Sequence, residues 1–194
     1  MIRKIKRKLS IYRRKPLAWI FRFHDWHTLP LSLKQYAQEI VAFLNRQEKR
    51  SSCLEIGCGL GDIIGKVDFC KCTGLDSDSR VLRAARFLNR LKGAKGITFK
   101  KFKFPDDRLS GKFDVIILVN WIHDIEPAIL RKKIREYYSD NLNPGGVMVI
   151  DTIEHQGYRF AHNIDFLTAD LQSEKTLLGT YENSRKVWVI TKNK

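Results

Sequence analysis

The stretch LEIGCGLGD, residues 54–62, decides the fold of this 194-residue chain. A short apolar run at residues 53–56 predicts a buried strand, and Gly57, Gly59 and Gly61 follow it at alternate positions. Glycine adopts backbone conformations that other residues avoid, so this spacing predicts a tight turn that presents amides to a ligand, with the next helix starting beside it. The dinucleotide pattern G-x-G-x-x-G is not met, because Gly61 comes one position too early.

Two acidic residues at strand ends narrow the choice of ligand. Glu55 lies two residues before Gly57, where a carboxylate repels a pyrophosphate but suits an ammonium group. The next apolar run, residues 72–75, is followed by Asp76, and an acidic side chain there can accept hydrogen bonds from both hydroxyls of a ribose. The pattern therefore predicts a nucleoside ligand with a cationic amino-acid portion.

Short apolar runs alternate with helical periods along the rest of the chain. The predicted strands are residues 53–56, 72–75, 97–99, 115–119 and 147–150, and the predicted helices are residues 32–45, 79–91 and 126–138, with Ser32 as N-cap of the first and a turn at residues 143–146. Runs at residues 176–180 and 186–191 flank a turn at residues 182–184. This order predicts a doubly wound α/β fold with a mostly parallel seven-stranded sheet and an antiparallel C-terminal hairpin.

Positive charge is concentrated at the start of the chain. The formal net charge is +15, and residues 1–22 carry nine basic residues and no acidic one. One face of a predicted helix there carries the apolar residues Ile2, Ile5, Leu9 and Tyr12, and after Pro16 comes an aromatic-rich patch, Trp19, Ile20, Phe21 and Phe23. We predict a basic amphipathic arm over residues 1–31 and one domain over residues 32–194. Residues 1–22 suit an anionic partner, either a membrane surface or a nucleic acid.

The apolar runs and the cysteines of the sequence predict where the protein is located and whether it binds a metal. The longest apolar run before Arg22 is short for a secretory signal, and no stretch approaches the roughly 20 apolar residues that span a bilayer. All four cysteines lie within residues 53–72, a region predicted to form a strand, a turn and a strand and not a disulfide framework. This pattern favours a reducing cytoplasm. Cys70 and Cys72 have no second ligand pair, so no metal site is predicted. We expect a cytoplasmic protein that is peripheral at the inner face of the membrane if the arm binds lipid.

Four motifs in order resemble those of class I S-adenosylmethionine-dependent methyltransferases. They are E-x-G-x-G-x-G, the acid closing the second strand, FDVIILVNWIH and NPGGVMVID, and the resemblance covers about residues 52–192. It implies S-adenosyl-L-methionine as cofactor and methyl transfer as the reaction. It also implies which residues bind the cofactor. Glu55 would support the amino group, Asp76 would hold the ribose, and Asn120 would lie near the reactive end. Gly57, Cys58 and Gly59 would line the methionine part, and Gly61 and Ser77 complete the cofactor-binding set.

One feature of that family is missing. An acidic residue usually follows the third strand and contacts the adenine amino group, but Lys103 falls near that place in the run FKKFKFPDD. Phe102, Phe104 or Asp106 are the alternatives for holding adenine.

The acceptor side is predicted from the loops after the fourth and fifth strands. A hydroxyl acceptor needs a base, and His123 and His155 follow these strands, so both are candidate catalytic bases. Residues 24–27 (HDWH) suit either a lid or an anchor for the arm. The Asn/Asp-Pro-Pro-aromatic motif of amino-directed nucleic-acid methyltransferases is absent, since Asn120 and Trp121 stand there.

These features favour O-methylation of a small molecule or glycan in surface-polysaccharide biosynthesis. The alternatives are an RNA methyltransferase that uses the basic N-terminal arm, and a noncatalytic cofactor-binding scaffold.

Overall fold

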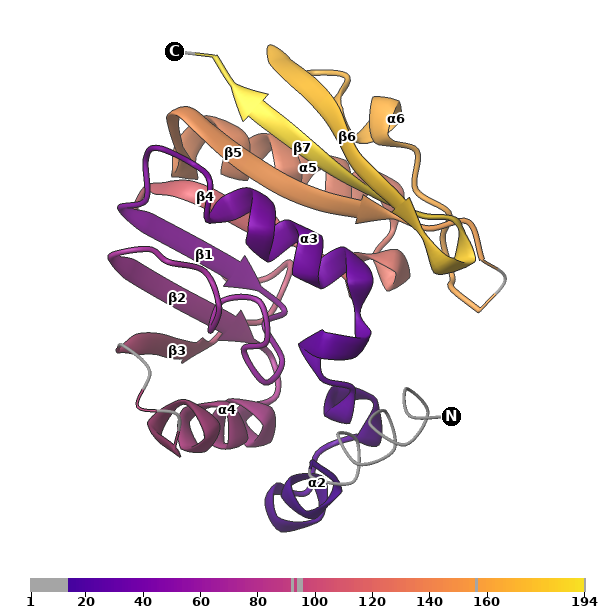
Figure 1. Cartoon of the computed structure of the whole chain (residues 1–194). Helices are drawn as coiled ribbons and strands as arrows, with labels where there is room; N and C mark the ends of the chain where they lie inside the picture. The colour runs from indigo at the N-terminus through magenta and orange to yellow at the C-terminus, as the bar shows by residue number, and fades with distance from the viewer. Residues whose placement is uncertain (1–13, 92, 94–95, 156, 194) are drawn as a thin grey trace.

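The computed structural model describes residues 14–91, 93, 96–155 and 157–193 (Figure 1). The amphipathic helix predicted from Ile2, Ile5, Leu9 and Tyr12 lies outside these residues.

The core of the fold is one seven-stranded sheet with strand order β3-β2-β1-β4-β5-β7-β6. Its parallel strands are β1 (Ser52–Ile56), β2 (Lys71–Asp76), β3 (Ile97–Lys101), β4 (Phe113–Leu118) and β5 (Leu142–Thr152). The hairpin of β6 (Ser173–Tyr181) and β7 (Arg185–Lys192) joins through β7, which runs antiparallel to β5. The predicted doubly wound fold with an antiparallel C-terminal hairpin is confirmed.

Helices cover both faces of this sheet because alternate strand residues point to opposite sides. In β4, Val115 and Ile117 pack with α3 (Gln35–Leu44) and α4 (Ser79–Leu91), whereas Ile116 and Leu118 pack with α5 (Pro127–Glu136) and the short α6 (Ile164–Thr168). Figure 1 shows α3 crossing one face and α5 behind the other. Both faces are therefore buried, and the carboxyl ends of the strands are left as the place for a ligand.

Three local predictions were wrong. No helix follows the glycine turn before β2; successive turns run from Gly57 to Val67, and three glycines at positive φ interrupt any helical path there. Ser32 is not an N-cap, because it lies in the 3-10 segment η2 (Leu31–Leu33) and α3 starts at Gln35. Residues 143–146 do not precede β5 but bulge within it, where the pairing register with β4 shifts.

The segment before α3 packs against the domain. Pro16 lies in the first turn of α2 (Lys15–Phe21), where its missing N–H costs no helical bond. Ala18 and Phe23 are buried against Val81 of α4 and against Leu60. After the 3-10 segments η1 (Asp25–Thr28) and η2, the chain enters α3. The division into an arm and a domain at residue 31 stays a prediction. No helix in the described ranges is long and apolar enough to cross a membrane.

Candidate functional site

The turn after β1 depends on glycine. Gly57, Gly59 and Gly61 have φ angles of 73°, 53° and 73°. A Cβ atom at Gly57 would lie 2.2 Å from Cδ1 of Trp121, so the indole fills the space beside the turn. The indole N–H donates a hydrogen bond to the Ile56 carbonyl oxygen at 2.6 Å, which fixes this aromatic wall. The backbone of the turn thus remains open to a ligand that fits beside Trp121.

Glu55 lies under the turn and is almost fully buried. Its Oε2 atom accepts the Ile64 N–H at 2.9 Å, and burial raises the pKa of Glu55 to about 8. A small cavity of about 50 Å³ beside it is also lined by Lys34 and Asp62. An ammonium group placed here would favour the ionised form of Glu55, since an opposite charge offsets the cost of burial.

Asp76 ties the end of β2 to the glycine turn. Its Oδ2 atom accepts the Gly59 N–H and its Oδ1 atom accepts the Asp78 N–H, both at 2.9 Å. Burial nevertheless raises the pKa of Asp76. Asp76 and Ser77 line a first pocket of about 760 Å³, which lies between the turn, the end of β2 and the segment after α2.

Aromatic rings form much of the first pocket. Phe102, Phe104 and Trp121 line it, and the rings of Phe104 and Trp121 meet edge to face at 4.9 Å between centroids. Two of the three adenine candidates, the phenylalanines, therefore border this pocket. The third, Asp106, pairs with Lys103 at 2.7 Å on the surface instead.

A second pocket of about 590 Å³ adjoins the first. Trp26 and Trp121 line both pockets. The second is further lined by the three tyrosines Tyr36, Tyr158 and Tyr181, and by Asn120, Lys34 and Arg185. Two adjacent pockets that share walls can hold two molecules side by side, which is the arrangement that direct group transfer requires.

A buried ion pair fixes the rim between the pockets. Asp151 is fully buried, and its Oδ1 atom accepts the Asn120 N–H at 2.9 Å while its Oδ2 atom contacts the Arg185 guanidinium. Arg185 also donates to Oδ1 of Asn120 at 3.1 Å and lies over the Tyr36 ring, 4.6 Å from its centroid. These contacts hold Asn120 in a left-handed conformation with φ of 76°. Strands β5 and β7 thus jointly position the residue that follows β4.

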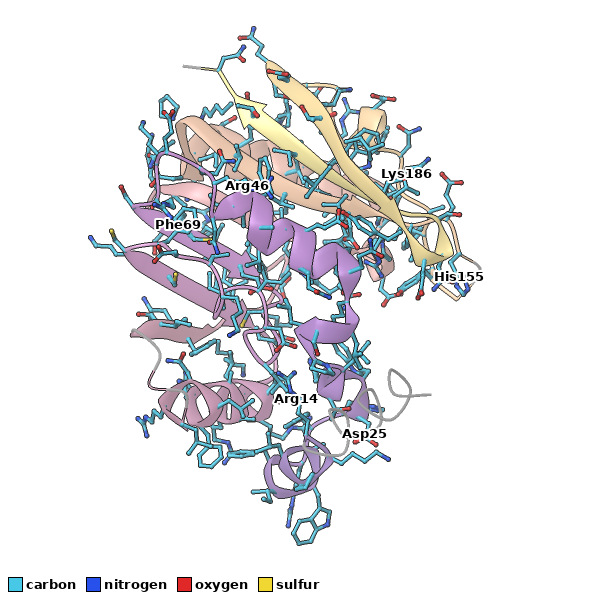
Figure 2. All side chains as sticks on the ribbon, in the orientation of Figure 1. Arg14, Asp25, Arg46, Phe69, His155 and Lys186 are labelled. Atoms are coloured by element: carbon cyan, nitrogen blue, oxygen red, sulfur yellow. The ribbon has the colours of Figure 1, made fainter. Side chains whose placement is uncertain are left out.

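The two predicted bases lie in different surroundings. His123 is fully buried, its Nε2 atom is 3.2 Å from Oδ2 of Asp151, and burial together with Arg185 lowers its pKa to about 4. His155 is exposed on the loop after β5, where its Nδ1 atom accepts the Gly157 N–H at 3.0 Å (Figure 2). Neither histidine lines the first or the second pocket. Their roles as bases stay predictions.

Residues 24–27 border the first pocket. His27 stacks on Trp26 with 3.6 Å between ring centroids, and burial lowers the pKa of His27 to about 4. A Cβ atom at Gly59 would lie 3.1 Å from Nδ1 of His27, so the imidazole covers the glycine turn. The segment is thus part of the wall that encloses the turn.

Sequence patterns missed the cations of the site. Lys34 lies 3.8 Å from Asp62, and Arg14 forms two hydrogen bonds with the same carboxylate at 2.7 and 2.9 Å (Figure 2 labels Arg14). Arg185 was missed because it lies far along the chain from the glycine turn. Arg185 stands directly before the predicted run at residues 186–191, and no sequence pattern marks it as buried.

Among the described residues, no group of three or more His, Cys, Asp or Glu side chains is arranged to hold a metal ion. The four cysteines are free, and only Cys70 is exposed.

Comparisons with known proteins agree with this geometry. Residues 26–185 match a family model described as a methyltransferase domain. A comparison with curated protein sequences gives no match.

Solved structures of similar fold include three methyltransferases. N-methyltransferase NodS from Bradyrhizobium japonicum WM9, in complex with S-adenosyl-L-homocysteine, has 19% identity and a TM-score of 0.68, covering 84% of this chain and 88% of that one. Magnesium protoporphyrin IX methyltransferase (ChlM) from Synechocystis PCC 6803, with bound SAM, has 14% identity and a TM-score of 0.68, covering 82% and 79%. CalS10, an amino pentose methyltransferase from Micromonospora echinaspora, has 15% identity and a TM-score of 0.64, covering 91% and 95%.

At these identities the solved structures show a shared fold, whereas the family model spans most of the chain. The chain belongs to the methyltransferase domain family and is a class I S-adenosylmethionine-dependent methyltransferase.

Proposed function

We propose that the chain methylates an oxygen of a small molecule or glycan held in the second pocket, with S-adenosylmethionine held in the first pocket and at the glycine turn. The observation that carries this proposal is that the two pockets meet at Trp26 and Trp121. Bound S-adenosylmethionine supplies a methyl group on a sulfonium. In-line transfer forms a carbon–oxygen bond as the carbon–sulfur bond breaks, and the hydroxyl proton goes to a base or to solvent.

The cofactor's charged end fits the small cavity under the turn. Glu55 would pair with its ammonium group, and Lys34 is placed to pair with its carboxylate, because Lys34 lines this cavity. Burial lowers the pKa of Lys34, so an anion beside it would offset the cost of keeping its charge. Asp76 and Ser77 would hold the ribose, and Phe102 and Phe104 would contact adenine at the far side of the first pocket.

The second pocket fits a ring that carries hydroxyl groups. Its tyrosines and tryptophans offer apolar faces, while Asn120, Gln35 and Asn183 offer hydrogen bonds at its edges. The similar structures named above include proteins described as methyltransferases of an amino pentose and of magnesium protoporphyrin IX. These descriptions support a small cyclic acceptor. We propose that this acceptor belongs to surface-polysaccharide biosynthesis.

Substitution of the two histidines tests which residue accepts the proton of the acceptor hydroxyl. His123 and His155 remain the candidate bases, and loss of a general base lowers kcat by about 10²- to 10⁴-fold. His123→Gln and His155→Gln, each compared with wild type for kcat and for cofactor affinity, separate a base from a residue that only supports the fold.

Calorimetry and a transfer assay test the proposal together. Lys34→Met should weaken S-adenosylmethionine binding about tenfold, as expected for loss of one buried charge contact, while the exposed control Lys132→Met should leave it unchanged. Tyr158→Ala should lower methyl transfer and spare cofactor binding, because Tyr158 lines the second pocket but neither the first pocket nor the small cavity. A screen of glycans, sugar nucleotides and RNA with labelled cofactor then identifies the acceptor class.

Two outcomes of that screen would favour the alternatives. Methylation of RNA alone would support the RNA methyltransferase, whose basic arm includes residues 1–13 outside the described part of the chain. Cofactor binding without transfer to any acceptor would support the noncatalytic scaffold. Cytoplasmic location stays a prediction.

A further inference from the structure

An apolar patch is exposed where α2 packs on α4. Trp19 and Ile20 of α2 are 83% and 60% exposed, and Phe87 and Leu91 of α4 are 43% and 68% exposed. The Phe21 and Phe87 rings lie 5.7 Å apart, so the two helices contact one another beside this patch. Figure 1 shows both helices together at one end of the molecule, away from the C-terminal hairpin. We call this surface the α2–α4 face.

The α2–α4 face is also basic. Neither α2 nor α4 contains an acidic residue. On α4, Arg83, Phe87, Arg90 and Leu91 recur at three and four residues, which places two arginines and two apolar side chains along one side of the helix. Arg83 and Arg90 are exposed, and neither forms an ion pair with any residue that the structure describes. Their charges are thus available to an anionic partner.

We propose that the α2–α4 face docks on an anionic lipid bilayer. Ile20 and Leu91 decide between lipid and nucleic acid, because aliphatic side chains gain by leaving water for an acyl layer, whereas RNA offers them no comparable apolar surface. A tryptophan such as Trp19 suits the headgroup boundary, and arginines beside it contact lipid phosphates.

Docking in this way orients the site. Arg22 follows α2 directly and lines the first pocket, as does Arg80 in the first turn of α4. The first pocket is therefore lined by residues at the ends of the two helices that form the α2–α4 face. The proposal requires neither the acceptor assignment made above nor any residue of the segment 1–13.

Vesicle sedimentation with the full chain tests the docking. Wild type should bind phosphatidylcholine vesicles that contain phosphatidylglycerol and should bind pure phosphatidylcholine much more weakly. Arg83→Glu/Arg90→Glu should weaken binding by about tenfold or more, since each basic residue near an anionic surface contributes roughly fivefold. Trp19→Ser/Leu91→Ser should weaken it by a similar factor through lost apolar contact.

Matched controls lie on other faces. Lys132→Glu/Arg135→Glu on α5 makes the same change in net charge at exposed positions, and Ile129→Ser/Leu177→Ser removes apolar side chains that are each 44% exposed. Both control proteins should bind the vesicles as wild type does. Calorimetry with S-adenosylmethionine should show unchanged cofactor binding in all four variants, which confirms that they are folded.

Three results would overturn the docking proposal. The first is equal loss of vesicle binding in the α5 charge variant, which would mean that net charge alone attracts the protein. The second is vesicle binding by the α2–α4 variants as strong as that of wild type. The third is absence of vesicle binding together with RNA binding that the α2–α4 variants lose, which would assign this face to nucleic acid.

Discussion

We expect Glu55 to couple cofactor binding to release of a proton. Its carboxyl group is mostly protonated near neutral pH, because burial raises its pKa to about 8. An ammonium group beside it would favour ionisation, so we expect the proton to leave as the cofactor binds. Between about pH 5.5 and pH 7, where the cofactor amino group stays charged, the affinity for S-adenosylmethionine should rise roughly tenfold for each pH unit.

Calorimetry at several pH values measures this dependence, and buffers of different ionisation enthalpy count the protons released. Glu55→Gln is the matched variant, since it keeps an acceptor for the Ile64 N–H and cannot ionise. A wild-type slope that persists in Glu55→Gln would show that another group carries the proton.

The effects of substitutions at Gly57 and Trp121 should depend on each other. Gly57→Ala places a methyl group where the indole lies, so we expect it to displace Trp121 and to weaken cofactor binding. In a Trp121→Ala background the same change meets no indole, and only the cost of the positive φ remains. A double-mutant cycle on unfolding free energy should therefore give a coupling of about 1 kcal/mol or more. Independent effects would mean that the ring moves aside without strain.

At the scale of elements, Asp151 and Arg185 join β5 to β7. Removing one partner of a buried pair leaves the other charge uncompensated, so Asp151→Asn should lower the free energy of unfolding by about 3–5 kcal/mol. The control is Asp170→Asn, which breaks the more exposed pair between Arg131 and Asp170 and should cost less than about 1 kcal/mol. Urea unfolding of the three proteins gives both values. Similar losses in the two variants would contradict the structural role assigned to the buried pair.

The strands were predictable because a strand that is buried on both faces leaves an unbroken apolar run. Residues 115–119, for example, coincide with β4 to within two residues. The absence of a helix after the glycine turn could not be predicted from the apolar pattern. Ile63 and Ile64 pack in the core as helix residues would, but they do so from consecutive turns. Ser32 was misassigned because Leu33 belongs to a separate 3-10 turn, and no side-chain cap marks the start of α3.

The glycine turn, Glu55 and Asp76 could be predicted as one site because they lie at the carboxyl ends of the adjacent strands β1 and β2. Lys34 and Arg185 could not, because they reach the site from the segment before α3 and from β7, and no local spacing in the sequence connects these segments to the turn. The tertiary fold alone brings them together.

At the scale of the whole molecule, we expect His123 to make the stability of the protein sensitive to mild acid. Burial lowers its pKa to about 4 in the folded state, whereas a histidine in the unfolded chain has a pKa of about 6.5. Below that value the unfolded chain binds a proton that the folded chain does not, so stability present above pH 6.5 is lost as the pH falls toward 4.

The expected contribution is a loss of about 2 kcal/mol between pH 7 and pH 5. Other groups also titrate in this range, and Glu55 acts in the opposite direction because its raised pKa favours the folded state at lower pH. Urea unfolding of wild type and His123→Asn at both pH values isolates the histidine: the difference in stability between the two proteins should shrink by that amount. A constant difference would show that His123 is not the acid-sensitive group.

The position of β7 between β5 and β6 also determines when the site can form during synthesis. Asp151 is made well before Arg185, so a nascent chain carries an unpaired carboxylate in β5 until β7 has left the ribosome. Because Arg185 donates to Oδ1 of Asn120, we expect Asn120 to gain its fixed conformation only once β7 is in place. The contacts that fix the rim between the pockets can thus form only after β7 has been made.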